Sequence, residues 1–312
     1  MEEEIRDCFL TITVVTYNSE VFIDETLASI SQQCSLDIQI ILADDASTDN
    51  TLFKLKKWKT LNESNFHEIL LLESQTNRGV VENFSRTFIK AKGSWIKAIA
   101  GDDLFYTDAI KSMRSDASKN PKNSIIIGKA KLFGNEKIEN VIIPRHERIK
   151  NLKTINQCKK YIFEGKIFPG VSFMIQTKVL REIDVFKYAK GQIEDIPFQL
   201  ELLTNGYHFK FSEHIYIKYR QHEKSVSSKH DYETLSKIYL EYQRILLTYA
   251  FRNIKVIYIL NASWNLFFGQ IIFLLGNKGA FCSLIEKIKR KLQPKRFFNM
   301  LSRLFNLIQF IK

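Results

Sequence analysis

Runs of β-branched and aliphatic residues alternate with helix-like segments over the first hundred residues, and this alternation constrains the fold more than any other feature. The runs that indicate buried strands are 9–16, 37–43, 67–73 and 94–100. The segments that indicate helices are 20–33, the stretch from ASTDNT to about Trp58, and Gly79 to about Ala91. Such alternation implies parallel strands joined by right-handed crossovers. The sequence therefore predicts an α/β fold, with a single Rossmann-like, mostly parallel central sheet flanked by helices.

The remainder of the chain mixes strands and helices before it becomes wholly helical. Its expected elements are strands at 124–133 and 170–176, a helix at 195–205, an extended segment at 207–219 and a polar loop from Arg220 to His230. From residue 231 onward the pattern is helical. We therefore expect one domain over 1–230 and a helical C-terminal extension over 231–312.

Each of the four early strands is followed by polar, turn-forming or acidic residues. In doubly wound sheets, ligands bind at the carboxyl ends of the strands. The loops that follow these strands should therefore converge on one crevice. The residues concerned are Thr16-Tyr17-Asn18, Asp44-Asp45-Ala46-Ser47, Asn77-Arg78-Gly79 and Gly101-Asp102-Asp103.

Asp102 and Asp103 are adjacent carboxylates, which repel each other unless a positive group lies beside them. A hard divalent cation with oxygen ligands meets that need, and Mg²⁺ usually completes its coordination shell with substrate phosphates. The pair therefore indicates a metal site for a diphosphate substrate. Because Asp also favours turns, an ordinary loop is the alternative for the dipeptide alone.

Asp44 and Asp45 pose the same question at a neighbouring strand end. One of them could cap the next helix, although Ser47 or Asp49 would serve equally well. A carboxylate would then be available to bind a nucleobase or ribose. A dinucleotide-binding site would also place an acid here, but it requires a glycine-rich turn after the first strand, where this chain has TYNSE.

Asp195 lies in the segment QIEDIP and is compatible with two interpretations. A general base needs a carboxylate in a cleft, near the hydroxyl that it deprotonates. An Asp before Ile-Pro at the start of a helix also resembles an N-cap, and the spacing alone favours that interpretation. One residue can fulfil both.

The loop from Tyr219 to Ser228 combines cations, an imidazole and hydroxyl groups. It could close over an anionic ligand, with Arg220 and Lys224 supplying positive charge. His222 could ligate a metal or hydrogen-bond to a phosphate. The alternative is a solvated polar loop without a ligand.

Taken in order, six segments resemble one family. VVTYN, LADDASTDNT, NRGVVENF, KGSWIKAIAGDD, QIEDIPFQLELL and YRQHEKSVSS resemble the inverting family-2 glycosyltransferases of the glycosyltransferase-A fold. The enzymes of bacterial capsule, O-antigen and lipooligosaccharide synthesis are the most similar. The resemblance covers about residues 8–230, and it implies a nucleotide-binding half over about 1–105 and an acceptor half over about 106–230.

The resemblance implies that the donor is a nucleotide sugar, most simply a UDP-sugar. Val15, Thr16 and Tyr17 would line the uracil pocket, and Asp45 would contact the base with Asp44 beside it. The other residues implied in nucleotide binding are Asn77, Arg78 and Asp102, the last of which would face the ribose or the sugar.

The resemblance also implies the residues of metal binding and catalysis. Asp103, the last Asp of the family's D-x-D-type signature, would hold Mn²⁺ or Mg²⁺ on the diphosphate, with His222 near the metal. Asp195, in the family's E-D motif, would be the catalytic base, with Glu194 nearby. The resulting reaction is a single displacement with inversion at the anomeric carbon. Arg220 and Lys224 would be loop contacts to the diphosphate.

The chain departs from the family pattern at three places. Val15-Thr16 replaces the usual proline before the Tyr-Asn pair, and Ala46 replaces the glycine of D-D-G-S. Phe84 stands where the family often has an arginine, for which Arg78 or Arg86 could substitute. These departures leave the cation that contacts the donor unassigned.

The C-terminal extension carries most of the chain's net positive charge. Residues 277–312 hold nine Lys or Arg and one acid, Glu286, so they contribute +8 of the net +12. Residues 256–276 carry no charge but are interrupted by polar side chains, and 281–312 alternate apolar and basic residues at helical spacing. We expect 256–312 to lie on an anionic membrane surface. A helical cap packed on the domain is the alternative, and a spanning helix is less favoured.

The remaining features indicate where and with what the protein works. The acidic start, MEEE, does not resemble a signal peptide, and the four separated cysteines are typical of a reducing compartment. We therefore expect a peripheral protein on the cytoplasmic side of the inner (plasma) membrane, with a saccharide acceptor that is lipid-linked. The clustered charge argues against nucleic-acid binding. A non-catalytic nucleotide binder or scaffold is the main alternative to an enzyme.

Overall fold

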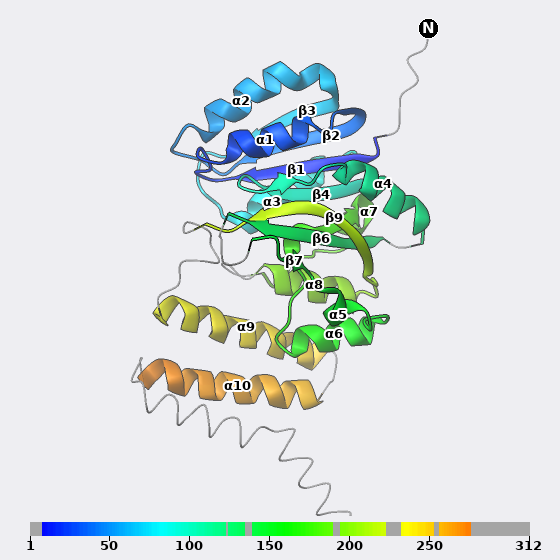
Figure 1. Ribbon diagram of the computed structural model, residues 1–312. Coiled ribbons are helices and arrows are strands. Elements are labelled where there is room, and N and C mark those ends of the chain that lie inside the picture. The colour runs from blue at the N-terminus through cyan, green and yellow to red at the C-terminus, as the bar shows by residue number, and fades with distance from the viewer. Residues whose placement is uncertain are drawn as a thin grey trace, which may run out of the picture. The chain divides into compact units, whose positions relative to one another are not determined.

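The computed structural model describes residues 8–122, 124–134, 139–189, 194–222, 232–252 and 256–275. The chain divides into two compact units, Met1–Ser225 and Val226–Lys312. The described part of the first unit is built on a nine-stranded sheet, and that of the second unit consists of two helices. Figure 1 labels these elements.

The first half of the sheet is parallel, as the sequence predicts. Its strands, in spatial order, are β3 (Phe66–Glu73), β2 (Ser35–Asp44), β1 (Leu10–Thr16) and β4 (Trp95–Ala100). The connecting helices are α1 (Ile23–Ser31), α2 (Thr51–Asn62) and α3 (Val80–Lys90). Because β1, β2 and β3 step across the sheet in one direction and β4 lies back on the other side of β1, right-handed crossovers place α1 and α2 on one face and α3 on the other. The predicted α/β fold class is confirmed.

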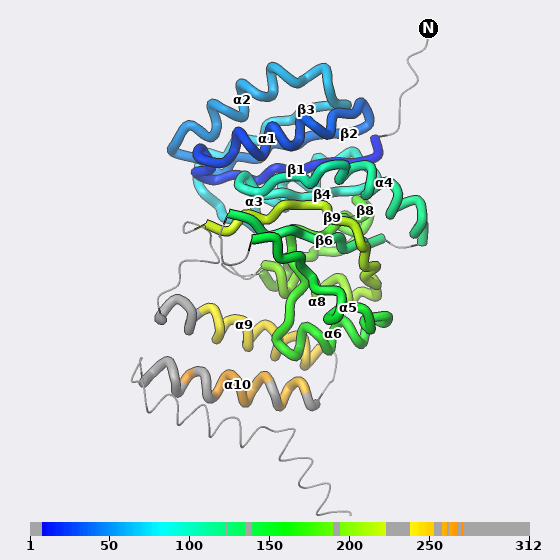
Figure 2. The backbone as a smooth tube through the Cα atoms, viewed as in Figure 1, coloured from blue at the N-terminus to red at the C-terminus, as the bar shows by residue number. Residues whose placement is uncertain are grey.

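The second half of the sheet is mixed. Its strands are β5 (Leu104–Phe105), β6 (Ile125–Phe133), β7 (Ile142–Ile143), β8 (Phe173–Gln176) and β9 (Lys210–Arg220). β8 pairs antiparallel with β4 and with β6, whereas β6 and β9 run parallel and side by side (Figure 2) although more than 70 residues separate them in the chain. The sequence predicted β6, β8 and β9 as extended segments but not how they pair, because pairing depends on contacts distant in sequence.

Helices and short turns surround this half. They are α4 (Ala109–Lys119), α5 (His146–Ile149), α6 (Ile155–Phe163), α7 (Thr177–Glu182), α8 (Asp195–Thr204) and the 3-10 turn η2 (Gly170–Ser172), whereas the other 3-10 turn, η1 (Glu63–Asn65), joins α2 to β3 in the parallel half. Only α8 was predicted. The turn η2 precedes β8 and packs against β4, β6 and β9.

A buried acid fastens α4 to β9. The Oδ2 atom of Asp116 accepts hydrogen bonds from Ser212 Oγ at 2.5 Å and Tyr216 OH at 2.6 Å, and His214 Nδ1 lies 3.0 Å away. Asp116 and Tyr216 are nearly inaccessible to solvent. Since buried polar groups without partners are costly, this network stabilises the fold rather than leaving a reactive group exposed.

The second unit contains α9 (Tyr232–Arg252) and α10 (Val256–Leu275), which pack against each other. Within the described ranges, no helix combines the length and apolar character needed to cross a membrane. The predicted amphipathic segment at 281–312 lies outside the described residues.

Candidate functional site

The loops that follow the four parallel strands are joined by backbone hydrogen bonds. Each strand end therefore lies next to its neighbour, as expected for the carboxyl edge of a parallel sheet. The bonds, each 3.0 Å long, run from Asp45 N to Thr16 O, from Gly101 N to Val15 O and from Ser74 N to Asp44 O.

The residues expected to contact the nucleotide differ in their exposure at this edge. Val15 and Thr16 are buried at the end of β1, whereas Tyr17, which follows them, is 48% exposed. Asn77 is also exposed, and its Oδ1 accepts a hydrogen bond of 3.0 Å from the Gly79 backbone. Among these four residues, Tyr17 therefore presents the side chain best placed to meet a ligand from solvent.

Asp44 and Asp45 both hold loops in place. Asp44 accepts hydrogen bonds from the Ser47 backbone N–H at 2.9 Å and from its hydroxyl at 2.5 Å, which closes the turn after β2. Asp45 Oδ2 accepts from the backbone N–H groups of Arg78 at 3.1 Å and Gly79 at 2.8 Å. Asp45 thus fixes the loop after β3, a contact that spans 33 residues.

The two candidate arginines occupy different positions. Arg78 is exposed and pairs with Glu82 at 2.5 Å. Arg86 is partly buried; its Nη2 donates to the Asp44 carbonyl at 2.6 Å and its Nε to Asn83 Oδ1 at 2.9 Å. Arg86 therefore stabilises the end of β2 through the Asp44 carbonyl, whereas the Arg78 side chain faces solvent.

Ala46 has φ = 62°, in the left-handed region that favours glycine. A non-glycine residue there costs about 1–2 kcal/mol, and a glycine loses about 0.5–1 kcal/mol in backbone entropy on folding. We expect Ala46→Gly to raise the free energy of unfolding by up to about 1 kcal/mol, measured by thermal denaturation. Ala46→Val, the matched control, should lower it. A glycine variant that melts below the parent protein would contradict this account.

Asp103 is completely buried directly after β4. Its Oδ1 accepts a hydrogen bond of 2.9 Å from the Arg220 backbone, whereas its buried Oδ2 has no hydrogen-bond partner among the described residues. Burial, together with the charge of Asp102, raises the pKa of Asp103 well above its ordinary value. A buried carboxylate oxygen without a partner is costly, and a divalent cation would satisfy it.

The donor set around Asp103 fits a metal that is shared with a ligand. The described residues contain no group of three His, Cys, Asp or Glu side chains that could hold an ion by themselves. His222 Nε2 lies 3.1 Å from Asp102 Oδ2, and the His222 ring packs against that of Phe22 with the centroids 4.5 Å apart and the planes tilted by 39°. Mg²⁺ typically takes one or two protein carboxylates and completes its shell with phosphates and water, which matches this arrangement. Lys224 lies outside the described residues.

Arg220 fastens the Asp102-Asp103 turn to α1. Its guanidinium lies between the rings of Phe22 and Phe133, at 4.7 and 4.5 Å from their centroids. Nε donates to the Asp102 carbonyl and Nη2 to Glu25 Oε2, both at 2.8 Å. With these contacts in place, the guanidinium positions the acidic turn.

Asp195 is the first residue of α8 and lies against Gly170. The N-cap residue is Glu194, which makes no side-chain capping hydrogen bond, so the interpretation of Asp195 as the cap is wrong. A Cβ atom on Gly170 would stand 2.9 Å from Asp195 Cγ, so only glycine leaves room for the carboxylate. Burial raises the pKa of Asp195 to about 6, although a hydrogen bond from the Gly170 backbone acts in the opposite direction.

Glu194 is a second acid with a perturbed pKa at the same helix start. Its Oε2 is buried and lacks a hydrogen-bond partner within the described part of the chain. Burial and the neighbouring Asp195 charge raise the pKa of Glu194 to about 7. Because the two carboxyl groups interact, they release their protons in two steps, and the pKa values of both lie above the ordinary range.

Two residues in the surroundings of these acids, Gly170 and Lys97, were not predicted from the sequence. Gly170 belongs to no motif, and Lys97 lies within KGSWIKAIAGDD, a segment in which only the acids were assigned a function. The available signal was a lysine at an interior position of a buried strand. Lys97 is fully buried, and its ammonium group donates to the carbonyls of Ala98, at 2.9 Å, and Val171.

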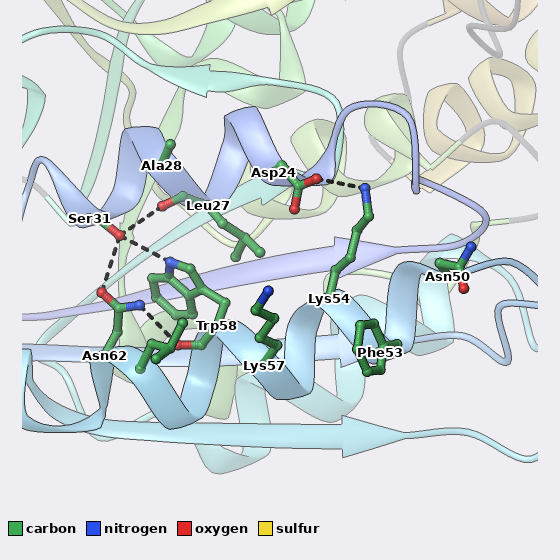
Figure 3. Close-up of a pocket in the computed structure, with 11 residues that line it drawn as sticks. Asp24, Leu27, Ala28, Ser31, Asn50, Phe53, Lys54, Lys57, Trp58 and Asn62 are labelled. Atoms are coloured by element: carbon green, nitrogen blue, oxygen red, sulfur yellow. Dashed lines mark hydrogen bonds and ion pairs between the residues drawn. The ribbon is translucent and has the colours of Figure 1, made fainter.

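A separate pocket of about 600 Å³ lies between α1 and α2 (Figure 3). An ion pair between Lys54 and Asp24 at 2.6 Å and a hydrogen bond from Trp58 Nε1 to Ser31 Oγ at 3.0 Å join its walls. None of the acids discussed above lines it. The pocket therefore belongs to the packing of two helices and not to the candidate site.

Comparison of the sequence with known proteins identifies a family and several relatives of this chain. Residues 11–187 match the profile described as glycosyl transferase family 2. The chain is 28% identical over 244 residues to the dTDP-rhamnosyl transferase RfbG of Shigella flexneri, across 72% of this chain and 78% of that protein. It is 31% identical to an uncharacterized glycosyltransferase of Mycoplasma genitalium, but that match spans only 38% of this chain and 40% of the relative's length.

Solved structures of low sequence identity share the fold. TarS of S. aureus in complex with UDP-GlcNAc superposes with a TM-score of 0.60 at 18% identity, over 83% of this chain and 70% of TarS. The mannosyltransferase PcManGT of Pyrobaculum calidifontis, in complex with GDP-Man and Mn²⁺, gives 0.57 at 15% identity, over 94% of this chain and 84% of that chain. The family profile covers more than half of the sequence. The chain therefore belongs to glycosyl transferase family 2 and has the glycosyltransferase-A fold.

Proposed function

We propose that the protein transfers a sugar from a nucleoside-diphosphate sugar to a saccharide acceptor in the synthesis of a bacterial surface polysaccharide. The observation that carries the proposal is the environment of two acids from separate segments. Asp103 has a buried oxygen without a partner among the described residues, and Asp195 rests on a glycine with its pKa raised to about 6. The environment of Asp103 suits a ligand of a cation, and that of Asp195 suits a general base.

At the donor side, Asp103 would hold Mn²⁺ or Mg²⁺ on the diphosphate, with Asp102 and His222 beside it. The metal, when bound, supplies electrostatic stabilisation to the departing nucleoside diphosphate. Arg220 keeps the acidic turn in place through Glu25 and the Asp102 carbonyl. The nucleoside would lie along the strand ends, near Tyr17 and Asp45, with Asn77 and Arg78 at the border. UDP is the first nucleotide to test.

At the acceptor side, Asp195 would take the proton of the attacking hydroxyl. The oxygen then bonds to the anomeric carbon from the face opposite the diphosphate, which departs with the bonding electrons. An α-linked donor would thus yield a β-linked product. A single proton held by the Glu194–Asp195 pair would leave one negative charge at the helix start, which suits a base that acts near neutral pH.

We expect the transfer rate to fall as the pH drops below about 6, because Asp195 must be ionised to accept a proton and its pKa is raised to about 6. A pH profile of kcat/KM should lose about tenfold per unit on this acid limb. Glu194→Gln should keep this acid limb and shift it to lower pH by no more than about one unit, because the variant removes the neighbouring acid and leaves Asp195 in place. A profile that stays flat down to pH 4.5 would count against Asp195 as the base.

The C-terminal segment 256–312 would keep the enzyme on the cytoplasmic membrane surface, next to a lipid-linked acceptor. The support is the sequence pattern of uncharged, then apolar and basic residues. Sedimentation with vesicles that contain phosphatidylglycerol, compared with neutral vesicles and with DNA, tests this attachment. Binding to DNA with equal salt dependence would overturn it.

The experiment that tests the proposed reaction is a panel of UDP-, dTDP- and GDP-sugars, each incubated with and without Mn²⁺. Metal-dependent release of the nucleoside diphosphate is the expected result. A non-catalytic nucleotide binder is the alternative, and it would bind a member of the panel in calorimetry without releasing product. Absence of both binding and release across the panel would overturn the proposal.

A further inference from the structure

Lys97 is a charged residue in the interior of the sheet. It lies on β4, between β1 and β8, and none of its surface is exposed. Lysines are almost never fully buried without a partner, because removing the ammonium group from water is costly. Burial lowers the pKa of Lys97 to about 7, with the charge of Asp103 acting in the opposite direction.

The hydrogen bonds of Lys97 connect two parts of the fold. One bond, of 2.9 Å, goes to the carbonyl of Ala98, within β4 itself. The other goes to the carbonyl of Val171, in the turn η2. Since β4 leads directly to Asp103, the side chain ties η2 to the strand that carries the candidate metal ligand.

The turn η2 is also the surface on which Asp195 rests. Gly170, its first residue, contacts the Asp195 carboxylate so closely that an added Cβ atom would overlap it. Gly170 is not in a left-handed conformation, so its lack of a side chain matters for space and not for backbone geometry. A shift of η2 relative to β4 would therefore move Gly170, and the Asp195 carboxylate that it contacts, relative to Asp103.

We propose that Lys97 is a positioning residue, which sets the Asp195 carboxylate relative to Asp103 by tying η2 to β4. The inference rests on the proposed function for the identity of the two acids. An aliphatic side chain would fill the same space without burying a charge, so Lys97 adds little to the free energy of unfolding. Its contribution is to fix the position of η2 relative to β4. Both a charged and a neutral amine can donate the two hydrogen bonds.

Lys97→Met tests the proposal, because methionine has a similar length and cannot donate to Val171. Ile96→Met is the matched control, because Ile96 is the buried residue that precedes Lys97 in β4 and its side chain points to the opposite face of the sheet. We expect Lys97→Met to lower kcat for sugar transfer about 10- to 100-fold. The donor KM and the slow hydrolysis of the donor by water, which needs no aligned acceptor, should change less than about threefold. Gly170→Ala, which disturbs the contact between η2 and Asp195, should likewise lower kcat for transfer while changing the donor KM and donor hydrolysis much less.

Hydrogen exchange supplies a readout independent of activity. The Ser172 amide donates to the Pro169 carbonyl at 3.0 Å, so it reports on the turn. In Lys97→Met the amides of 168–174 should exchange about tenfold faster, and those of β1 should not change. Unchanged exchange in this segment would overturn the proposal, as would an equal fall in transfer and hydrolysis. If the parent protein releases no product from any donor, the proposed function fails, and the exchange result still decides whether Lys97 holds the turn.

Discussion

Replacing Asp195 with asparagine should abolish sugar transfer and leave donor binding almost unchanged. General-base catalysis contributes about 10²- to 10⁴-fold, so kcat is expected to fall by about that factor. Asparagine has the shape of the carboxyl group, and its carbonyl oxygen can accept the hydrogen bond from the Gly170 backbone that Asp195 now accepts. Asp103, the proposed metal ligand, belongs to a different segment and is not altered. Turnover is measured by chromatography of the product, and donor affinity by calorimetry.

Glu194→Gln is the matched control for this variant. It changes the adjacent acid, whose pKa is also raised, to an amide at the same helix start and leaves the Asp195 carboxylate in place. Its transfer rate at pH 6.5 should therefore remain within about threefold of the parent rate. If Asp195→Asn kept a tenth of the parent activity, or if Glu194→Gln lost as much as Asp195→Asn, another residue would be the base. Loss of donor binding in Asp195→Asn would show that the residue has a structural function instead.

The parallel half of the fold was predictable because its signals are local. A run of β-branched residues, a turn and a helix-like spacing follow one another within about 30 residues, and the crossover rule fixes how such units assemble. The positions of Asp102 and Asp103 at a strand end followed directly. The mixed half was less predictable, since β9 pairs with β6 across more than 70 residues and no local pattern records that register.

The candidate site was predictable in its acids and not in their surroundings. Asp45 was expected to face a ligand, and its carboxylate holds the backbone of the loop after β3, a contact visible only once β2 and β3 are side by side. Asp195 resembled an N-cap, but the cap position falls on Glu194. Gly170 and, as we propose, Lys97 determine where the proposed base Asp195 lies, yet a single glycine or lysine in a sequence carries no signal of its partner.

The two acids differ in a way that a stability measurement can distinguish. Each acid accepts a hydrogen bond from a backbone N–H group, that of Gly170 for Asp195 and that of Arg220 for Asp103, but the second oxygen of Asp103 is buried without a partner among the described residues. A carboxylate that is buried and unsatisfied destabilises the protein until a cation arrives. Conversely, a cation that binds the folded protein alone stabilises it by mass action. Function at Asp103 is therefore expected to oppose stability in the metal-free protein.

Asp103→Asn should consequently make the metal-free protein more stable and less active. An amide in this position removes the buried charge, and we expect the free energy of unfolding at neutral pH to rise by about 1–3 kcal/mol. Transfer should fall about 10²- to 10³-fold, because the diphosphate loses the cation that stabilises its departure. Mn²⁺ with a nucleoside diphosphate should raise the melting temperature of the parent protein and not that of the variant. Thermal denaturation and product release, each with and without Mn²⁺, provide the measurements.

Asp116→Asn is the control that separates this effect from the general consequence of changing a buried acid. Asp116 is nearly as inaccessible as Asp103, but its Oδ2 accepts two hydroxyl hydrogen bonds and lies beside His214. Its substitution should lower the melting temperature and leave the response to Mn²⁺ intact, the reverse of Asp103→Asn. If Asp103→Asn instead destabilised the metal-free protein and still gained stability from Mn²⁺ and nucleotide, Asp103 would be a structural acid. The metal would then have to bind elsewhere.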